Sequence, residues 1–102
     1  MKNEVLELVV YKVKNDQLET FKSETLFKLR NLIENFAGFV KYDTFSSVEA
    51  DGVFADCVIW ENLESARFAA EKIKSLENEE PFASIFGSME EIKIFQHFKA
   101  VA

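Results

Sequence analysis

The 102-residue chain has one cysteine, one proline, one histidine and three glycines. Because Cys57 has no partner, a disulfide within the chain is excluded, and the fold does not depend on an oxidising compartment. No hydrophobic run approaches the ~20 residues that span a bilayer. Glu4 and Glu7 interrupt the segment that would be the apolar part of a signal peptide. We therefore expect a cytoplasmic protein.

Basic residues are also scarce, with 12 Lys and Arg against 18 Asp and Glu and a net charge of −6. Without a basic stripe to neutralise phosphates, neither a nucleic acid nor an anionic membrane is an expected partner. The sequence has no glycine-rich loop for phosphates or dinucleotides. One histidine, one cysteine and scattered carboxylates lack metal-ligand spacing. We expect no cofactor and no metal.

Phenylalanine, in contrast, is abundant, with 11 residues in a chain that is 48% hydrophobic. A single domain of this size, residues 1–102, buries roughly 65% of its unfolded surface. Each phenylalanine needs a large apolar contact area. So many of them in so small an interior favour a homodimer.

Hydrophobic periodicity divides the chain into six main elements. Alternating residues predict strands at 4–13, 39–45, 53–60 and 90–98. Spacing of three and four predicts helices at 16–36 and 63–77, and a short helix after Pro81. Asp16 with Glu19 forms a candidate capping box, and Asn62 a candidate cap.

The order strand, helix, strand, strand, helix, strand is typical of the ferredoxin-like α+β fold. This fold has a four-stranded antiparallel sheet with helices on one face, and the bare face needs a partner. A second copy is the simplest partner, so a homodimer through the sheet face is predicted. In the strand order 4-1-3-2, we expect the first and third strands to be central and parallel.

Three acidic residues interrupt apolar strands: Glu7, Asp43 and Asp56. Glu7 and Asp56 are expected at similar depth, with Asp43 opposite Asp56 and Lys41 beside them. Close carboxylates raise one another's pKa, which would provide a proton acceptor near neutral pH. The alternative is a hydrated, salt-bridged dimer interface with Lys41 and Lys93 as counter-charges.

His97 is a candidate general base, because its unperturbed pKa lies near 6.5. On the last strand it alternates with Phe95 and Lys93, and we expect it on the face opposite Ile92 and Ile94. The alternative is a histidine at the rim of the fold. A Cys57–His97 nucleophile pair is conceivable, but a thiol in apolar surroundings is usually inert.

Aromatic residues suggest two further surfaces. Tyr11, Tyr42 and Trp60 are suited to stack on a flat aromatic ligand, although core packing explains them equally well. Phe27 and Phe68 lie off the apolar faces of their helices, which favours contact with a neighbouring subunit over isolated exposure.

The chain resembles the dimeric α/β-barrel superfamily, especially the antibiotic-biosynthesis-monooxygenase-like proteins. The resemblance covers nearly the whole chain. It rests on a long first helix followed by Gly38-Phe39-Val40, on Trp60-Glu61 running into an alanine-rich helix, and on Phe82-x-x-Ile85-Phe86 before a last strand with His97. It implies two sheets packed face to face across a dimer axis.

The resemblance implies three hypotheses about function. The first is a cofactor-independent monooxygenase acting on a small aromatic or quinol-type substrate, with His97, Asp56 and Glu7 as proton acceptors. Trp60, Tyr11, Asp43 and Lys41 would then bind the substrate. The second is a non-catalytic ligand-binding homodimer, and the third a structural one. Residues 4–13 contain no Asn and residues 61–77 no His, which argues against the heme-degrading branch.

Overall fold

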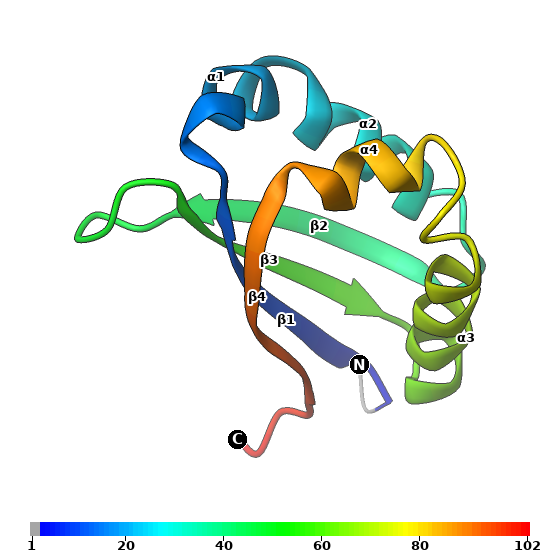
Figure 1. Ribbon diagram of the computed structural model, residues 1–102. Helices are drawn as coiled ribbons and strands as arrows, with labels where there is room; N and C mark the ends of the chain where they lie inside the picture. Colours follow the sequence, from blue (N-terminus) through cyan, green and yellow to red (C-terminus); the bar gives the residue numbers. More distant parts are fainter. Residues whose placement is uncertain (1–2) are drawn as a thin grey trace.

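A computed structural model describes residues 3–102 and shows a four-stranded sheet with helices on one face (Figure 1). The sheet has the order β2-β3-β1-β4, and all neighbouring strands are antiparallel. The predicted ferredoxin-like α+β fold is therefore confirmed. The strands are β1 (Val5–Val13), β2 (Phe39–Ser46), β3 (Val53–Trp60) and β4 (Met89–Phe98).

The expectation that the first and third strands are parallel is wrong, because β1 and β3 pair antiparallel. The topology explains why. The first helical region is a crossover that brings the chain back to the end of the sheet where β1 began, so β1 and β2 run in the same direction. The β2–β3 hairpin then reverses the chain, and β3 lies between the two.

The first helical region is less regular than predicted. It consists of a 3-10 turn (Asn15–Gln17), α1 (Leu18–Thr20), a π-helical turn (Phe21–Thr25) and α2 (Leu26–Ile33). The predicted capping box is absent, since Asp16 lies inside the 3-10 turn and no side chain caps either helical start. The wider π turn accommodates Phe21, which is fully buried against Tyr11 and Phe54.

The other helices begin as expected. The Asn62 side chain accepts a hydrogen bond of 2.8 Å from the Ser65 backbone N–H and caps α3 (Leu63–Ser75). Pro81 directly precedes the short α4 (Phe82–Gly87). Within residues 3–102, no helix combines the length and apolar character needed to cross a membrane.

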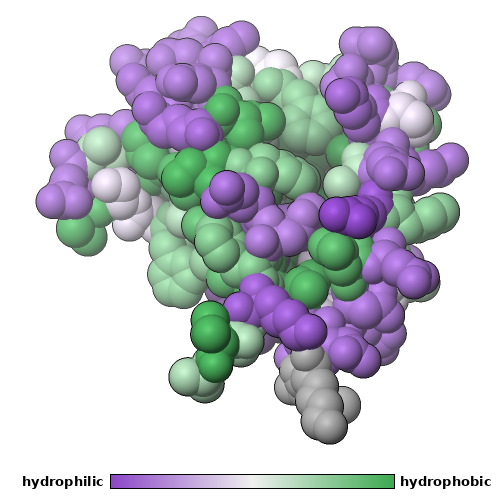
Figure 2. Space-filling view, turned by 90° about the horizontal axis from the view of Figure 1, so that it is seen from below, coloured by the Kyte–Doolittle hydropathy of each residue, from purple (hydrophilic) through white to green (hydrophobic). Residues whose placement is uncertain are grey.

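Strand alternation separates the sheet into two different faces. The face under the helices carries the buried core, including Tyr11, Phe54 and Trp60. The opposite face carries partly exposed apolar side chains: Leu6, Leu8, Val10, Ala55, Cys57, Ile59, Ile94 and Phe98. Seen from below, away from α2 and α4, hydrophobic residues occupy much of the centre of the molecule (Figure 2).

Irregularities in two strands decide which side chains share the helix-covered face. In β2, Phe39 pairs with Trp60 but Lys41 with Ile59, so Val40 is an extra residue. In β4, Val10 pairs with Ile94 but Tyr11 with Ile92. Ile92 therefore shares a face with His97, and the prediction that they lie on opposite faces is wrong.

Candidate functional site

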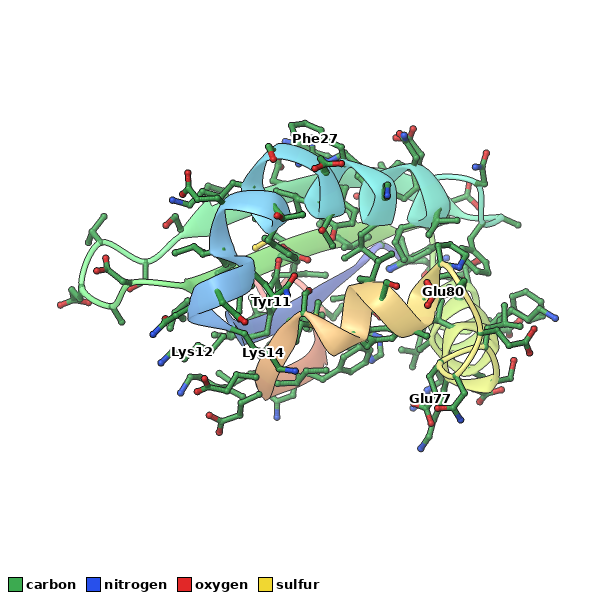
Figure 3. The ribbon with its side chains drawn as sticks, turned by 45° about the horizontal axis from the view of Figure 1, so that its top comes forward. Tyr11, Lys12, Lys14, Phe27, Glu77 and Glu80 are labelled. Atoms are coloured by element: carbon green, nitrogen blue, oxygen red, sulfur yellow. The ribbon has the colours of Figure 1, made fainter. Side chains whose placement is uncertain are left out.

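A cavity of about 720 Å³ lies between the sheet and its helices. Its walls are largely apolar and come from α2, α3, α4 and the strands: Val9, Leu29, Ile33, Val58, Trp60, Ala69, Ala70, Ile73, Phe86, Met89, Ile92 and Phe95. Polar side chains line it as well: Glu7, Tyr11, Tyr42 and Asp56 from the middle of the sheet, Glu90 and Glu91 from the start of β4, Glu71 and Lys74 from α3, and Glu77 from just after α3. Figure 3 shows Tyr11 beneath the gap between the first helical region and α4. A few polar groups in an apolar cavity are typical of a small-molecule site.

Asp56 is the centre of a buried hydrogen-bond network. Its Oδ1 accepts hydrogen bonds from the hydroxyls of Tyr11 at 2.9 Å and Thr44 at 2.9 Å. Its Oδ2 accepts one from the Tyr42 hydroxyl at 2.6 Å. Three donors from two neighbouring strands therefore hold one carboxylate, which is only 3% exposed.

Burial dominates the ionisation of this network. It raises the pKa of Asp56, although the hydroxyls of Tyr42, Thr44 and Tyr11 and the charge of Arg30 lower it in part. Burial and the adjacent Asp56 charge raise the pKa of both tyrosines well above the ordinary range. The tyrosines are thus protonated donors, and their rings are fixed as walls of the cavity.

Glu7 and His97 form a second polar pair beside this network. Nε2 of His97 lies 2.9 Å from Oε2 of Glu7, across directly paired positions of β1 and β4. Burial raises the pKa of Glu7, and the charge of Asp56 adds to this effect. Contact with His97 opposes it. The result is a buried carboxyl that ionises at a higher pH than an exposed one, as a general base requires.

Trp60 provides the largest aromatic wall. It is 1% exposed and packs edge-on against Phe39, with ring centroids 6.0 Å apart. Its indole N–H is near enough to Glu7 to favour the charged carboxylate. However, within residues 3–102 it meets no acceptor in good hydrogen-bond geometry.

Five of the seven predicted site residues therefore lie together on the helix-covered face: Glu7, Tyr11, Asp56, Trp60 and His97. Lys41 and Asp43 do not. Asp43 pairs with Cys57 rather than Asp56, because the extra residue in β2 shifts the register by one and reverses the face. The two side chains instead approach each other at 3.4 Å outside the cavity.

The conceivable Cys57–His97 pair is not formed. Cys57 pairs with Leu8 and His97 with Glu7, so their side chains lie on opposite faces of the sheet. Burial also raises the pKa of the thiol. Across residues 3–102, no group of three or more His, Cys, Asp or Glu side chains is arranged to hold a metal ion.

Sequence reasoning missed Thr44 and Arg30. Thr44 takes the place opposite Asp56 that was predicted for Asp43, two residues after Tyr42 on the same strand face. Arg30 of α2 lies 5.3 Å from the centroid of the Tyr42 ring and lowers the pKa of Asp56. Thr44 could not be predicted because the bulge in β2 changes its pairing partner. Arg30 could not be predicted because the packing of α2 on β2 leaves no signal in the sequence.

Several solved structures share this fold. A protein from Bordetella bronchiseptica with the provisional name antibiotic biosynthesis monooxygenase superposes with a TM-score of 0.79 over 98% of this chain and 99% of its own, at 16% identity. The chain has the antibiotic-biosynthesis-monooxygenase-like fold. The predicted resemblance to these proteins is thereby confirmed at the level of fold.

Other proteins of this fold carry different descriptions. SnoaB, a cofactor-independent oxygenase from Streptomyces nogalater, matches with a TM-score of 0.70 over 98% of this chain and 95% of its own, at 16% identity. A protein of unknown function from Bacteroides thetaiotaomicron, with oxidoreductase as a suggested role, matches at 0.68 over 98% and 100%, at 23% identity. No family model and no curated protein matches the sequence.

Proposed function

We propose that this protein is a cofactor-independent monooxygenase-like enzyme acting on a small aromatic or quinol-type substrate. The observation that carries the proposal is the buried Glu7 carboxylate, which lines an apolar cavity and is in contact with His97. A substrate with an acidic C–H or O–H group would lose its proton to Glu7. The similarity to SnoaB supports the oxygenase chemistry at the level of fold.

The reaction requires only the substrate, dioxygen and a base. The C–H bond of a substrate CH2 group breaks, and the proton passes to Glu7. The carbanion reduces dioxygen and forms a C–O bond, and the resulting peroxide anion takes back the proton to become a hydroperoxide. Loss of the second C–H proton and cleavage of the O–O bond then release water and leave a carbonyl. One oxygen atom enters the substrate and the other leaves as water. An apolar cavity excludes solvent from the reactive anion.

The remaining cavity residues position the ring. Trp60 and Tyr11 form part of the cavity wall, with 1% and 0% of their surface exposed. All three hydroxyls around Asp56 donate to it, so Asp56 acts by fixing Tyr11 and Tyr42 rather than by taking the substrate proton. This assigns Asp56 a positioning role and gives proton transfer to Glu7 and His97.

The proposed enzyme is a homodimer through the bare sheet face. Partly exposed side chains such as Leu8, Ile94 and Phe98 form an apolar surface there. Exposed apolar patches of this kind mark contact sites. A second copy of the same face is the partner that matches it in chemistry and extent.

Anthrone is a suitable first probe, because its CH2 group is acidic and dioxygen converts it to the carbonyl of anthraquinone. We expect oxygen uptake above the uncatalysed rate, with one atom from 18O2 in the product. Glu7→Gln should lower the rate at least about tenfold, since general-base catalysis contributes on the order of 10²–10⁴. Glu24→Gln, an exposed carboxylate of the first helical region, should act like wild type.

Two results would count against the proposal. An equal rate with Glu7→Gln would remove Glu7 as the base. Quenching of Trp60 fluorescence by anthrone, without any product, would favour the non-catalytic ligand-binding dimer. A panel of hydroquinones and naphthols tested in the same way extends the search beyond one ring system.

A further inference from the structure

The Glu7–His97 pair lies in the wall between two spaces. Glu7 lines the cavity described above. His97 lines a smaller hollow of about 390 Å³ at the end of the sheet, formed by the start of β1, the start of α3 and the end of β4. Neither side chain lines both spaces. The 2.9 Å contact between them therefore joins the cavity to this end hollow.

We propose that Glu7 and His97 form a proton relay that exchanges the substrate proton with solvent through the end hollow. This inference rests on the proposed function, because it requires Glu7 to take a proton from a substrate. The proton passes from the substrate to Glu7, and from Glu7 to Nε2 of His97. The imidazolium then releases a proton from Nδ1 to water. The ring then turns, so that the nitrogen carrying the substrate proton reaches the water of the end hollow and exchanges it for a solvent proton. The return steps deliver this solvent proton to Glu7, so no electron moves and no proton is lost overall.

Exposure supports this direction of transfer. The Glu7 side chain is 10% exposed and that of His97 21%, so the histidine has the better contact with water. An imidazole accepts a proton on one nitrogen and releases one from the other, which a carboxylate alone cannot do across a wall. Phe95 packs edge-on against the imidazole ring, with the ring centroids 5.7 Å apart.

The charged groups around the relay come from three further segments. Asp56 of β3 acts on Glu7 from the cavity side. Glu64 of α3 and Lys99, directly after β4, line the end hollow with His97. One acidic and one basic group therefore line the outlet beside His97.

The relay makes a different prediction from a simple base. If Glu7 merely held the proton, that same proton would return to the substrate anion. With a relay, the proton is replaced from solvent before it returns. Without dioxygen, the CH2 hydrogens of bound anthrone should therefore exchange with D2O, at a rate that depends on His97.

The experiment measures two rates for each variant: anaerobic deuterium uptake into anthrone, corrected for spontaneous exchange, and aerobic conversion to anthraquinone. His97→Gln keeps an amide N–H for Glu7 but cannot pass a proton onward. We expect it to lower exchange at least about tenfold, while oxygenation falls several times less. Glu7→Gln should lower both rates together. Imidazole added to His97→Gln should restore part of the exchange, because the end hollow has room for it.

Each outcome decides the inference. Equal losses of exchange and oxygenation in His97→Gln would mean that His97 only supports Glu7, and the relay would be wrong. Wild-type exchange at the spontaneous rate would also overturn it. Wild-type exchange that depends on His97, but without oxygenation in air, would uphold the relay and reject the proposed monooxygenase function. The single histidine allows its ring resonances to confirm that Glu7→Gln remains folded.

Discussion

Asp56 shows how a buried charge can be tolerated in so small a protein. An isolated carboxylate at 3% exposure would be strongly destabilising. Hydroxyl donors from Tyr11, Tyr42 and Thr44 offset that cost. The same donors become fixed in place, so one network both stabilises the fold and shapes the cavity.

The bond between Tyr42 and Asp56 predicts an energetic coupling that a double-mutant cycle can measure. We expect Tyr42→Phe to cost about 1–3 kcal/mol of unfolding free energy. Its coupling to Asp56→Asn should be on the order of 1 kcal/mol, as for residues in one network. Urea denaturation of the two single variants and the double variant gives the value.

The adjacent Asp43 provides the matched control for that cycle. It neighbours Tyr42 in sequence but lies on the other face of the sheet. Tyr42→Phe and Asp43→Asn should therefore be additive within about 0.5 kcal/mol. Strong coupling to Asp43 instead of Asp56 would mean that β2 pairs without the extra residue.

Glu7 predicts a dependence of stability on pH. Its folded-state pKa is raised above the ordinary value of 4.5, mainly by burial. The folded state therefore binds a proton more tightly than the unfolded state, and stability increases as pH falls. Between pH 7.5 and pH 5, wild type should gain stability relative to Glu7→Gln, and that gain disappears as pH rises through the raised pKa.

Urea denaturation across this pH range measures the difference directly. Glu24→Gln removes an exposed carboxylate, and its profile should run parallel to that of wild type. If Glu7→Gln also runs parallel to wild type, burial does not perturb Glu7, and its assignment as a base near neutral pH loses its support.

At the scale of elements, strand and helix positions could be predicted because the side chains repeat with a period. β3 and α3 begin at the expected residues, and Asn62 caps α3 as its sequence position suggests. Register could not be predicted, because a bulge leaves no periodic signal. Because Val40 is an extra residue in β2, Asp43 lies outside the site and Thr44 lies inside it. Alternation also predicted that Trp60 and Asp56 share one face of the sheet, but it could not show which face the helices cover.

The connection from α2 to β2 depends on a glycine that contacts α3. Gly38 has a φ of +85°, and a Cβ there would collide with the Ser65 side chain. Gly38→Ala should therefore lower the unfolding free energy by about 1–3 kcal/mol. Adding Ser65→Gly should recover the steric part of the loss and leave the backbone part.

Gly87 is the control for this substitution in thermal or urea denaturation. It lies in α4 with nothing within 4 Å of an added Cβ. Gly87→Ala should leave stability unchanged or raise it by about 0.5–1 kcal/mol. A Gly38→Ala variant as stable as wild type would show that the α3 start can move aside.

Two elements give the cavity an acidic mouth. Glu71 of α3 and Glu77 just after it line the cavity together with Glu90 and Glu91 of β4, and Lys74 is the one basic residue among the lining side chains of residues 3–102. Lys12 and Lys93 lie 3.6 Å from Glu90 and 3.5 Å from Glu91, respectively, and offset their charge, so the excess negative charge comes mainly from Glu71 and Glu77. Such a surface favours cations and disfavours anions, most strongly at low salt. A neutral or amine-bearing aromatic substrate therefore fits better than a carboxylate.

The single tryptophan reports this preference, because Trp60 lines the cavity. 4-Nitrobenzylammonium should quench its fluorescence at several-fold lower concentration than 4-nitrobenzoate, with the neutral alcohol in between. Glu71→Gln with Glu77→Gln, or high salt, should make the three quenching concentrations more alike. Tighter binding of the benzoate would contradict the acidic mouth.

At the scale of the whole molecule, the sheet separates the proposed dimer surface from the proposed site. One face carries Glu7, Asp56 and His97 under the helices, while the other presents Leu8, Ile94 and neighbouring apolar residues. Phe27 and Phe68 are 53% and 62% exposed on the helices, and Figure 3 shows Phe27 pointing away from the sheet. They offer a rival surface for contact with a second copy.

Native mass spectrometry and light scattering distinguish the two surfaces. Wild type should have twice the 11.8 kDa mass of the chain. Leu8→Glu places a charge in the middle of the bare sheet face and should give a monomer, while Phe68→Ser should leave the dimer intact. The reverse result would place the interface on the helices. Because Leu8 points away from the cavity, a folded Leu8→Glu monomer should still bind 4-nitrobenzylammonium with near wild-type affinity, and a loss of binding together with dimerisation would mean that the second copy helps to shape the site.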